Sequence, residues 1–350
     1  MSGSSSVFRA AFQGLSYPSV FHNRSSSSTI YPANHDNPKL DAFESHVCEE
    51  LRRLEECGNY LSADWLRQAL DVCLYVHSMV EENFPHIGKN SKWVNEHLED
   101  MVKLLDICNA LRESMSDIKQ YKVELQLIVH GFQGCGPIGA RQLLRARTAL
   151  GNFNDPSAKA KEASEGKSRL ENCSSMLRRM GERLVAPPSD AATASGGAAF
   201  LEPIYASKAL MVFVCGVLVA AISTKSKRHL PQLCAGQTAW ACSLQTLHHK
   251  VKEEIEKGRN KGTTCTLLYE LKAVDSSSRS LYDLVNKLIN SKSVPPNESQ
   301  ALELRQSVQS LRNCISELES GTAPFERQIS EIFRVLVSGR MALLDVLSYS

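Results

Sequence analysis

Residues 209–224 limit the fold of this chain more than any other stretch, because these 16 residues carry no charge. A membrane-crossing helix needs about 20 mostly apolar residues, whereas a run of about 10 to 14 is typical of a buried core helix. The run therefore predicts a helix buried either in a bundle or in lipid, and we favour the bundle. The residues that define this membrane or core helix are Ala209, Leu210, Val212, Phe213, Val214, Val217, Leu218, Val219 and Ile222.

Most of the remaining chain shows the three- and four-residue apolar spacing of amphipathic helices. The first such series consists of Leu40, Phe43, Val47, Leu51 and Leu54. No stretch shows the two-residue alternation that is typical of a half-buried strand. The sequence therefore predicts an all-α fold, a multi-helix bundle of long amphipathic antiparallel helices with one central, strongly apolar helix.

Glycine, proline and serine mark the expected helix ends. Gly58 is expected to end the first helix in the left-handed conformation, and Ser62 is expected to cap the second helix. Residues 151–166 are expected to form a loop or a frayed helix start. Gly321 and Pro324 predict a short turn, which would make the last two helices an antiparallel hairpin.

Composition divides the chain into a disordered Ser-rich tail (1–35), an N-terminal helical part (36–185), a linker (186–197) and a C-terminal helical part (198–350). The two helical parts are expected to pack as one bundle. The tail contains ten serines and no acidic residue. This composition is typical of a disordered tail and also of an organelle transit peptide, and we favour the tail. Its candidate phosphorylation sites are Ser25, Ser26, Ser27 and Ser28.

Charge is distributed unevenly along the chain. Residues 36–135 carry 10 Lys/Arg and 18 Asp/Glu, and residues 136–350 carry 28 and 20. The simplest interpretation is a set of solvated helix faces. The two regions could also attract each other within one fold, or the basic region could face anionic lipid or an acidic partner. Lys225, Lys227 and Arg228 directly follow the apolar run, where they predict either a solvated helix end or a lipid-facing basic cluster.

The sequence contains no convincing catalytic motif. The glycines from Gly134 to Gly139 match G-x-G-x-x-G, but a helical pattern precedes them where a dinucleotide site needs a strand. His249 and Glu253 lie one helical turn apart and lack a third metal ligand. The 11 cysteines form no C-x-x-C pair, which predicts reduced thiols that serve as small core residues in an intracellular compartment. We therefore expect no enzyme, no cofactor, and no catalytic, cofactor-binding or metal-binding residues.

Six segments together resemble the BYPASS family of plant proteins. They are L-S-A-D-W-L (61–66), K-W-V-N-E-H-L-E-D-M-V-K-L-L-D-I-C-N-A-L (92–111), L-L-R-A-R-T-A-L (143–150), E-N-C-S-S-M-L (171–177), V-F-V-C-G-V-L-V-A-A-I-S (212–223) and L-Y-E-L-K-A-V-D-S-S-S-R-S-L-Y-D-L (268–284). The resemblance begins near residue 38 and continues to the C-terminus, leaving out residues 186–197.

The resemblance implies a non-enzymatic developmental regulator that supports normal root and shoot growth by restraining a root-derived mobile signal that arrests the shoot. A related branch is associated with the exocyst, so an adaptor of secretory trafficking is the alternative, and an enzyme of signal metabolism is a third possibility. The expected partners are trafficking or signalling proteins and an anionic membrane surface, and no nucleic acid. The expected location is the cytoplasm, at a membrane or crossing it once, or the chloroplast if the N-terminus is a transit peptide.

Overall fold

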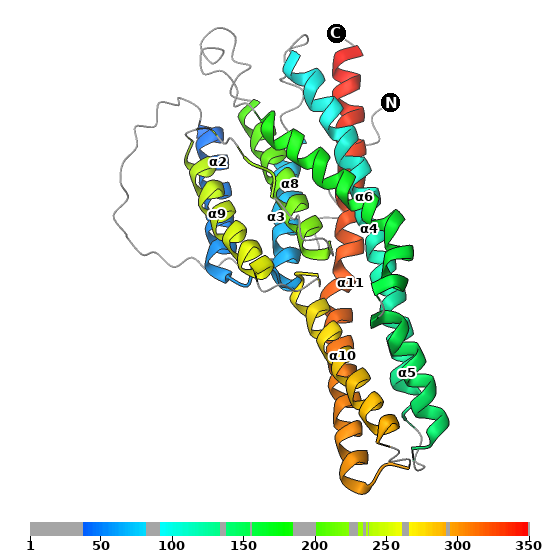
Figure 1. Ribbon diagram of the computed structural model, residues 1–350. Helices are drawn as coiled ribbons and strands as arrows, with labels where there is room; N and C mark the ends of the chain where they lie inside the picture. The colour runs from blue at the N-terminus through cyan, green and yellow to red at the C-terminus, as the bar shows by residue number, and fades with distance from the viewer. Residues whose placement is uncertain are drawn as a thin grey trace, which may run out of the picture. The chain divides into compact units, whose positions relative to one another are not determined.

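The computed structural model describes residues 38–81, 92–133, 138–154, 156–184, 201–223, 230–233, 236, 238–260, 266–291 and 295–348. Within these ranges the chain forms nine helices and no strand, so the all-α prediction is confirmed (Figure 1). The helices are α2 (Pro38–Cys57), α3 (Ala63–Glu81), α4 (Lys92–His130), α5 (Ala140–Asn154), α6 (Pro156–Glu182), α8 (Leu201–Ile222), α9 (Ala239–Asn260), α10 (Tyr269–Asn290) and α11 (Glu298–Ser348). The Ser-rich tail and the 186–197 linker lie outside the described residues and stay predictions.

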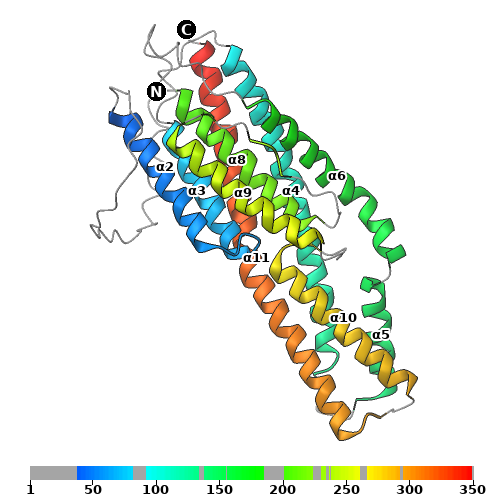
Figure 2. The ribbon, with the colours of Figure 1, turned by 60° about the vertical axis from the view of Figure 1, so that its left-hand side comes forward.

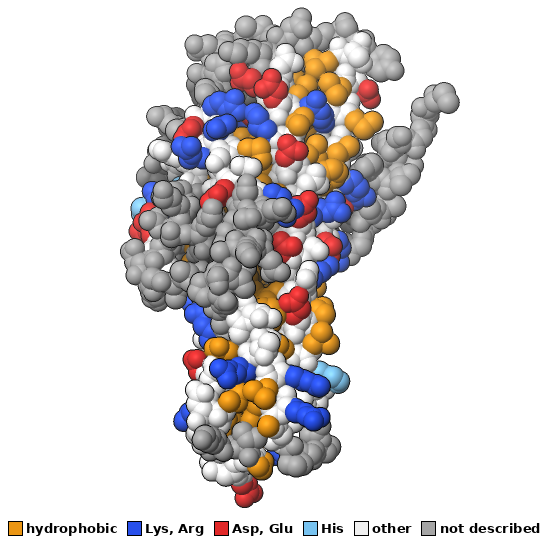
Figure 3. Space-filling model, turned by 45° about the vertical axis from the view of Figure 1, so that its right-hand side comes forward, with side chains coloured by type: hydrophobic (Ala, Val, Ile, Leu, Met, Phe, Trp, Pro, Cys, Tyr) orange, Lys and Arg blue, Asp and Glu red, His pale blue; other side chains and the backbone are white. Residues whose placement is uncertain are grey.

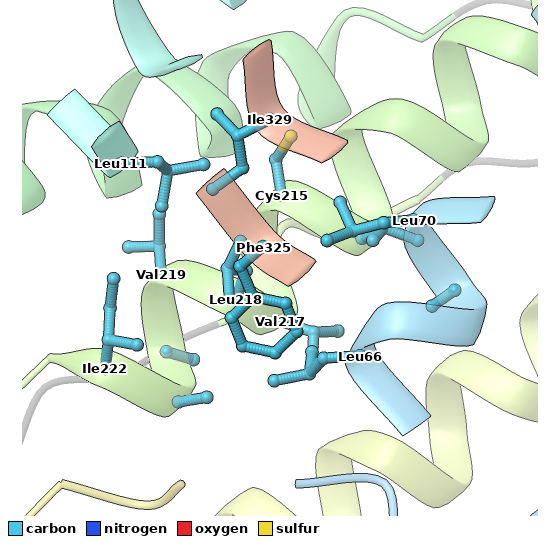
Figure 4. Close-up of a cluster of buried hydrophobic side chains, with 14 of the residues drawn as sticks. Leu66, Leu70, Leu111, Cys215, Val217, Leu218, Val219, Ile222, Phe325 and Ile329 are labelled. Carbon is cyan, nitrogen blue, oxygen red and sulfur yellow. The ribbon is translucent and has the colours of Figure 1, made fainter. Parts of the chain in front are cut away.

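The apolar helix α8 lies at the centre of the bundle. Every side chain from Pro203 to Ile222 is buried. Helices α3, α4, α6 and α9 pack against it (Figure 2). Figure 4 shows side chains of other helices gathered around its C-terminal half, including Leu66 of α3, Leu111 of α4 and Phe325 of α11. A helix that is apolar on all sides must be covered on all sides, and the amphipathic helices provide this cover.

Helices α4 and α11 run antiparallel to each other. Lys122 Nζ of α4 lies 2.6 Å from Glu319 Oε1 of α11. Arg340, later in α11, donates a hydrogen bond to the Leu98 carbonyl near the start of α4. The C-terminal part of α4 and the N-terminal part of α11 extend beyond α8. There α10 packs against α11 and against α5 (Figure 1). The two long helices therefore belong both to the group around α8 and to a second group with α5 and α10.

Residues 267–270, directly before α10 and in its first turn, join the ends of two other helices. The backbone N–H groups of Leu267 and Leu268 both donate to the Ala221 carbonyl at the end of α8, each at 2.9 Å. The Glu270 carboxylate accepts a hydrogen bond from the Ala63 N–H at 3.0 Å, at the start of α3. Helix ends leave backbone groups without partners within the helix. Residues 267–270 supply such partners at the end of α8 and at the start of α3.

Two of the predicted helix ends are confirmed. Gly58, which follows α2, has a positive φ of 59°, the left-handed conformation that glycine adopts without strain. Ser62 precedes α3, and its Oγ accepts a hydrogen bond from the Trp65 N–H at 3.2 Å. This bond satisfies one of the free donors in the first turn of the helix.

The predicted hairpin at Gly321 and Pro324 is wrong, because α11 is one continuous helix of 51 residues with Pro324 inside it. Proline in a helix interior costs about 3 kcal/mol through the lost hydrogen bond and a clash. The buried apolar face of α11 continues across Pro324, and its burial outweighs that cost. Gly321 is needed for close packing, since a Cβ at this position would lie 2.8 Å from the Ala63 Cβ. The residues of this face are Leu311, Leu318, Phe325, Ile329, Ile332 and Leu336.

Of the two alternatives for residues 151–166, a loop or a frayed helix start, the loop is wrong. Helix α5 continues to Asn154 and α6 begins at Pro156. Proline is well suited to the first turn of a helix, where its missing N–H has no partner to lose. Helix α8 begins at Leu201, eight residues before the charge-free run, and Lys208 therefore lies inside it.

Candidate functional site

Lys208 is the one charged residue in the buried stretch of α8. Its side chain is 9% exposed, and the neighbouring Ser207 is 5% exposed. A buried charge is costly unless it is paired and hydrogen-bonded. The surroundings of Lys208 therefore decide whether this end of α8 is stable inside the bundle.

Asp100 of α4 is the partner of Lys208. Its carboxylate is buried and forms an ion pair with the Lys208 ammonium group. Lys103 Nζ lies 2.7 Å from the Asp100 Oδ1, and a guanidinium nitrogen of Arg183, which follows α6, lies 3.4 Å from the same oxygen. Asp100 thus binds cations from α4, from α8 and from the residue that follows α6.

Two buried histidines complete the site, which we name the α8 polar cluster: His77, His97, Asp100, Ser207 and Lys208. His77 of α3 lies with its Nδ1 3.2 Å from the Ser207 Oγ. His97 lies on α4, one turn before Asp100, and is 6% exposed. Four described helices meet here, since the backbone of Val335 in α11 also interacts with His77.

Burial controls the protonation of the two imidazoles. Burial lowers the pKa of His77 to about 4, and the hydrogen bond with the Val335 backbone offsets part of this effect. Burial also lowers the pKa of His97 to about 3, and the positive charge of Lys208 lowers it further. Both imidazoles are therefore neutral at neutral pH.

Asp100 shows the opposite balance. Burial by itself would raise the pKa of this carboxyl group, but hydrogen bonds and positive charge from Lys103 and Lys208 outweigh burial and lower it. The site therefore holds an ionised Asp100 beside neutral imidazoles. Such a cluster can fix the position of a helix and can respond to protons. No group of three or more His, Cys, Asp or Glu side chains is arranged to hold a metal ion in the part of the chain that the structure describes.

The nine residues predicted for the membrane or core helix all lie in α8 and are buried among other helices. The same helix is long and apolar enough to cross a membrane, with a mean hydropathy of 2.0 in its most apolar window, 94% of which is buried. Length and composition therefore allow a membrane span, and burial in the bundle favours a core helix. The basic cluster Lys225, Lys227 and Arg228 and the candidate phosphorylation sites lie outside the described residues.

The other sequence motifs do not converge on a site. Residues 134–137 of the glycine motif lie outside the described residues, and Gly139 directly precedes α5. His249 and Glu253 form an exposed pair on α9 at 3.1 Å. Cys73, Cys108 and Cys173 are buried, as predicted for small core residues. Burial raises the pKa of each of these three thiols, so they stay protonated.

Charge attraction between the acidic and basic regions of the sequence accounts for part of the packing. Glu55 of α2 pairs with Lys250 of α9, and Asp100 pairs with Lys208. The pair of Lys122 with Glu319 has the opposite polarity. On the face shown in Figure 3, acidic and basic side chains are interspersed.

Sequence reasoning missed the α8 polar cluster. Lys208 directly precedes the charge-free run, and its neighbours in the sequence do not indicate that it is buried. Pro203 in the first turn of α8 is the signal that places the helix start earlier. Asp100 and His97 resemble ordinary polar residues of an amphipathic helix. Only the packing of α3, α4 and α8 shows that they are buried.

Comparisons with known proteins agree on one family. A family model described as "Protein ROH1-like" matches residues 9–175 and 154–347. Protein ROH1D of Arabidopsis thaliana is 27% identical over 376 residues, covering 92% of this chain and 92% of the relative. "Protein BPS1, chloroplastic" of the same plant is 25% identical over 332 residues, covering 93% of this chain and 88% of the relative. Since BPS1 is BYPASS1, the resemblance to the BYPASS family is confirmed.

The plant relatives extend beyond one species. UPF0496 protein 4 of Oryza sativa subsp. japonica is 26% identical over 259 residues, which is 71% of this chain and 54% of the relative. No solved structure matches the chain.

Proposed function

The chain belongs to the ROH1-like family, and from this membership we propose that it is a non-enzymatic regulator of plant development. We propose that it supports root and shoot growth by restraining a root-derived mobile signal that arrests the shoot, and that it does so as a helical interaction protein near membranes. The observation that carries the proposal is the match to ROH1D and BPS1 over more than nine-tenths of the chain. None of the family names describes an enzyme.

The proposed partners are trafficking or signalling proteins and an anionic membrane surface. The bundle supports a binding role because long amphipathic helices present extended polar faces to solvent around a closed core. Helix α8 supports a location near membranes because it is long and apolar enough to cross one. We propose the cytoplasm as the location, and the printed name of BPS1 makes the chloroplast the alternative to test.

Grafting tests the developmental role directly. Plants that lack the protein serve as rootstocks for wild-type shoots, and the reciprocal grafts serve as the control. A mutant root is expected to arrest a wild-type shoot, because the signal that the protein restrains is made in the root. Arrest that occurs only when the shoot is mutant would contradict the proposal.

The adaptor of secretory trafficking remains the alternative, because the chain is almost equally similar to ROH1D and to BPS1. Affinity purification of the full-length protein from root membranes distinguishes the two functions. Recovery of exocyst subunits together with normal grafted shoots would support the adaptor. Shoot arrest from mutant roots without exocyst recovery would support the developmental regulator.

A further inference from the structure

Helix α8 meets the requirements of a membrane span and of a core helix at once. Its 22 residues span about 33 Å, slightly more than the hydrocarbon thickness of a bilayer. Its surface is apolar all round, and lipid tails are as apolar as the leucine side chains of a protein core. Apolar burial alone therefore gives α8 little preference between protein and lipid.

The α8 polar cluster supplies a preference for the protein. Inside the bundle the Lys208 ammonium group is paired with Asp100. In a bilayer Lys208 would lie seven residues, about 10 Å, from the N-terminal end of α8. A lysine at this depth can extend its side chain to the headgroups, so the helix can enter lipid once Asp100 no longer holds it.

We propose that α8 is a conditional membrane helix: the α8 polar cluster holds it inside the protein at neutral pH, and acid releases it to insert into a lipid bilayer. This inference rests on the membrane part of the proposed function. It adds a trigger and identifies the helix that enters the membrane.

The charges around Lys208 explain the trigger. His77 faces the cluster from α3, His97, Asp100 and Lys103 face it from α4, and Arg183 faces it from just after α6. Arg340 of α11 donates a hydrogen bond to the carbonyl of Leu98, the residue after His97. From α9, Trp240 donates a hydrogen bond to Glu202, the other charged residue of α8, at 2.9 Å, and the titratable ring of His248 lies with its centroid 5.7 Å from that of Phe213 of α8. Three cations already surround the single carboxylate of Asp100. Protonated imidazoles would add positive charge in the same buried space, and a protonated Asp100 would remove the one negative charge.

Histidine protonation is therefore coupled to opening of the cluster. Burial keeps the pKa of His77 at about 4 and that of His97 at about 3, whereas an exposed imidazole titrates near 6.5. A state in which α8 has left the cluster binds these protons more tightly. Acid consequently shifts the population toward that state.

Vesicle flotation tests the inference with the full-length protein. The vesicles consist of phosphatidylcholine alone, which carries no net charge, so a more positive protein gains no electrostatic attraction to them. The protein is expected to remain in the dense fraction at neutral pH. Below about pH 5 it is expected to float with the vesicles and to stay with them through a high-salt wash at the same acidic pH. A sample without vesicles distinguishes insertion from aggregation.

Two variants examine the mechanism. His97→Gln removes one proton-binding group and is expected to lower the pH midpoint of flotation by about one unit. His249→Gln is the matched control, because the side chain of His249 is 73% exposed on α9, and it is expected to leave the midpoint unchanged. If one histidine is sufficient to trigger release, the single variant will not show it. Double substitution of His77 and His97 by glutamine addresses this case and is expected to lower the pH midpoint of flotation further.

Three results would overturn the inference: no flotation at any pH, flotation that a high-salt wash at the same acidic pH reverses, or the same midpoint in the wild type and the double histidine variant. None of them would affect the grafting test, so the failure of this inference can be told apart from failure of the developmental role. Normal shoots on mutant roots together with acid-dependent insertion would overturn the developmental role alone.

Discussion

Replacing Lys208 by methionine tests whether the α8 polar cluster is the buried, charge-balanced site that its geometry indicates. Removing one partner of a buried ion pair costs about 3–5 kcal/mol, because the remaining charge stays buried without compensation. Asp100 is 3% exposed, but it keeps Lys103 at 2.7 Å and Arg183 at 3.4 Å. Lys208→Met is therefore expected to lower the free energy of unfolding by about 3 kcal/mol, the lower end of this range.

Substitution of Asp100 is expected to cost more stability than substitution of Lys208. Among the described residues, Asp100 is the carboxylate within ion-pair distance of Lys208. Asp100→Asn therefore leaves a buried ammonium group without a countercharge and is expected to cost about 4–5 kcal/mol. Combining Lys208→Met with Asp100→Leu is expected to cost less than the sum of the single changes, because no charge of the pair then remains buried.

Urea unfolding followed by circular dichroism measures these losses as shifts of the midpoint at constant slope. Lys122→Met is the matched control, since it removes a lysine whose partner Glu319 has a side chain that is 50% exposed. That change is expected to cost less than about 1 kcal/mol. If Lys208→Met costs no more than Lys122→Met, the buried-pair argument is refuted. If Lys208→Met costs more than Asp100→Asn, then Lys103 and Arg183 do not share the charge of Asp100.

Acid is expected to weaken the fold, because unfolded histidine binds a proton near pH 6.5 whereas folded His77 and His97 bind one only near a pKa of about 4 and about 3. The free energy of unfolding that depends on the two neutral imidazoles is fully present above pH 6.5 and is lost as the pH falls toward 4. For His77 alone the loss is about 3 kcal/mol. Urea titrations across this range measure the loss, and a constant stability would contradict the burial of both imidazoles. Gly216→Ala is expected to cost about 1–3 kcal/mol by thermal or urea unfolding, because the added Cβ would lie 2.6 Å from the Pro231 Cδ. Gly139→Ala, where a Cβ has open space, is the control, and an equal effect of the two changes would argue against the close contact at Gly216.

Apolar spacing allowed the fold class and most of the core to be predicted from the sequence. The series from Leu40 to Leu54 is buried as expected. Spacing is informative here because each amphipathic helix has one face that must be buried, and this face can be recognised without knowing its partner. The same argument identified α8 as a helix that other helices must cover.

Two features depend on partners that are distant in the sequence and could not be predicted. Pro324 is typical of a turn when only its neighbours are considered, but the contact of Gly321 with Ala63 and the continuous apolar face of α11 keep the helix intact. The α8 polar cluster depends in the same way on Asp100 and Lys208, which are separated by most of α4, α5 and α6. A charged residue shows its burial only when the elements around it have been placed.

These distant contacts also explain how α8 finds one position in the bundle. A helix that is apolar on all sides has no preferred rotation or depth, because every rotation buries similar apolar area. The ion pair of Lys208 with Asp100 fixes one point, and the close approach of Gly216 to Pro231 fixes a second point eight residues further on, about 12 Å along the axis. Eight residues correspond to about 80° of rotation beyond two full turns, so the two contacts point in different directions. Together they define both rotation and depth, whereas exchanges of one apolar residue for another elsewhere in α8 change packing without moving the helix.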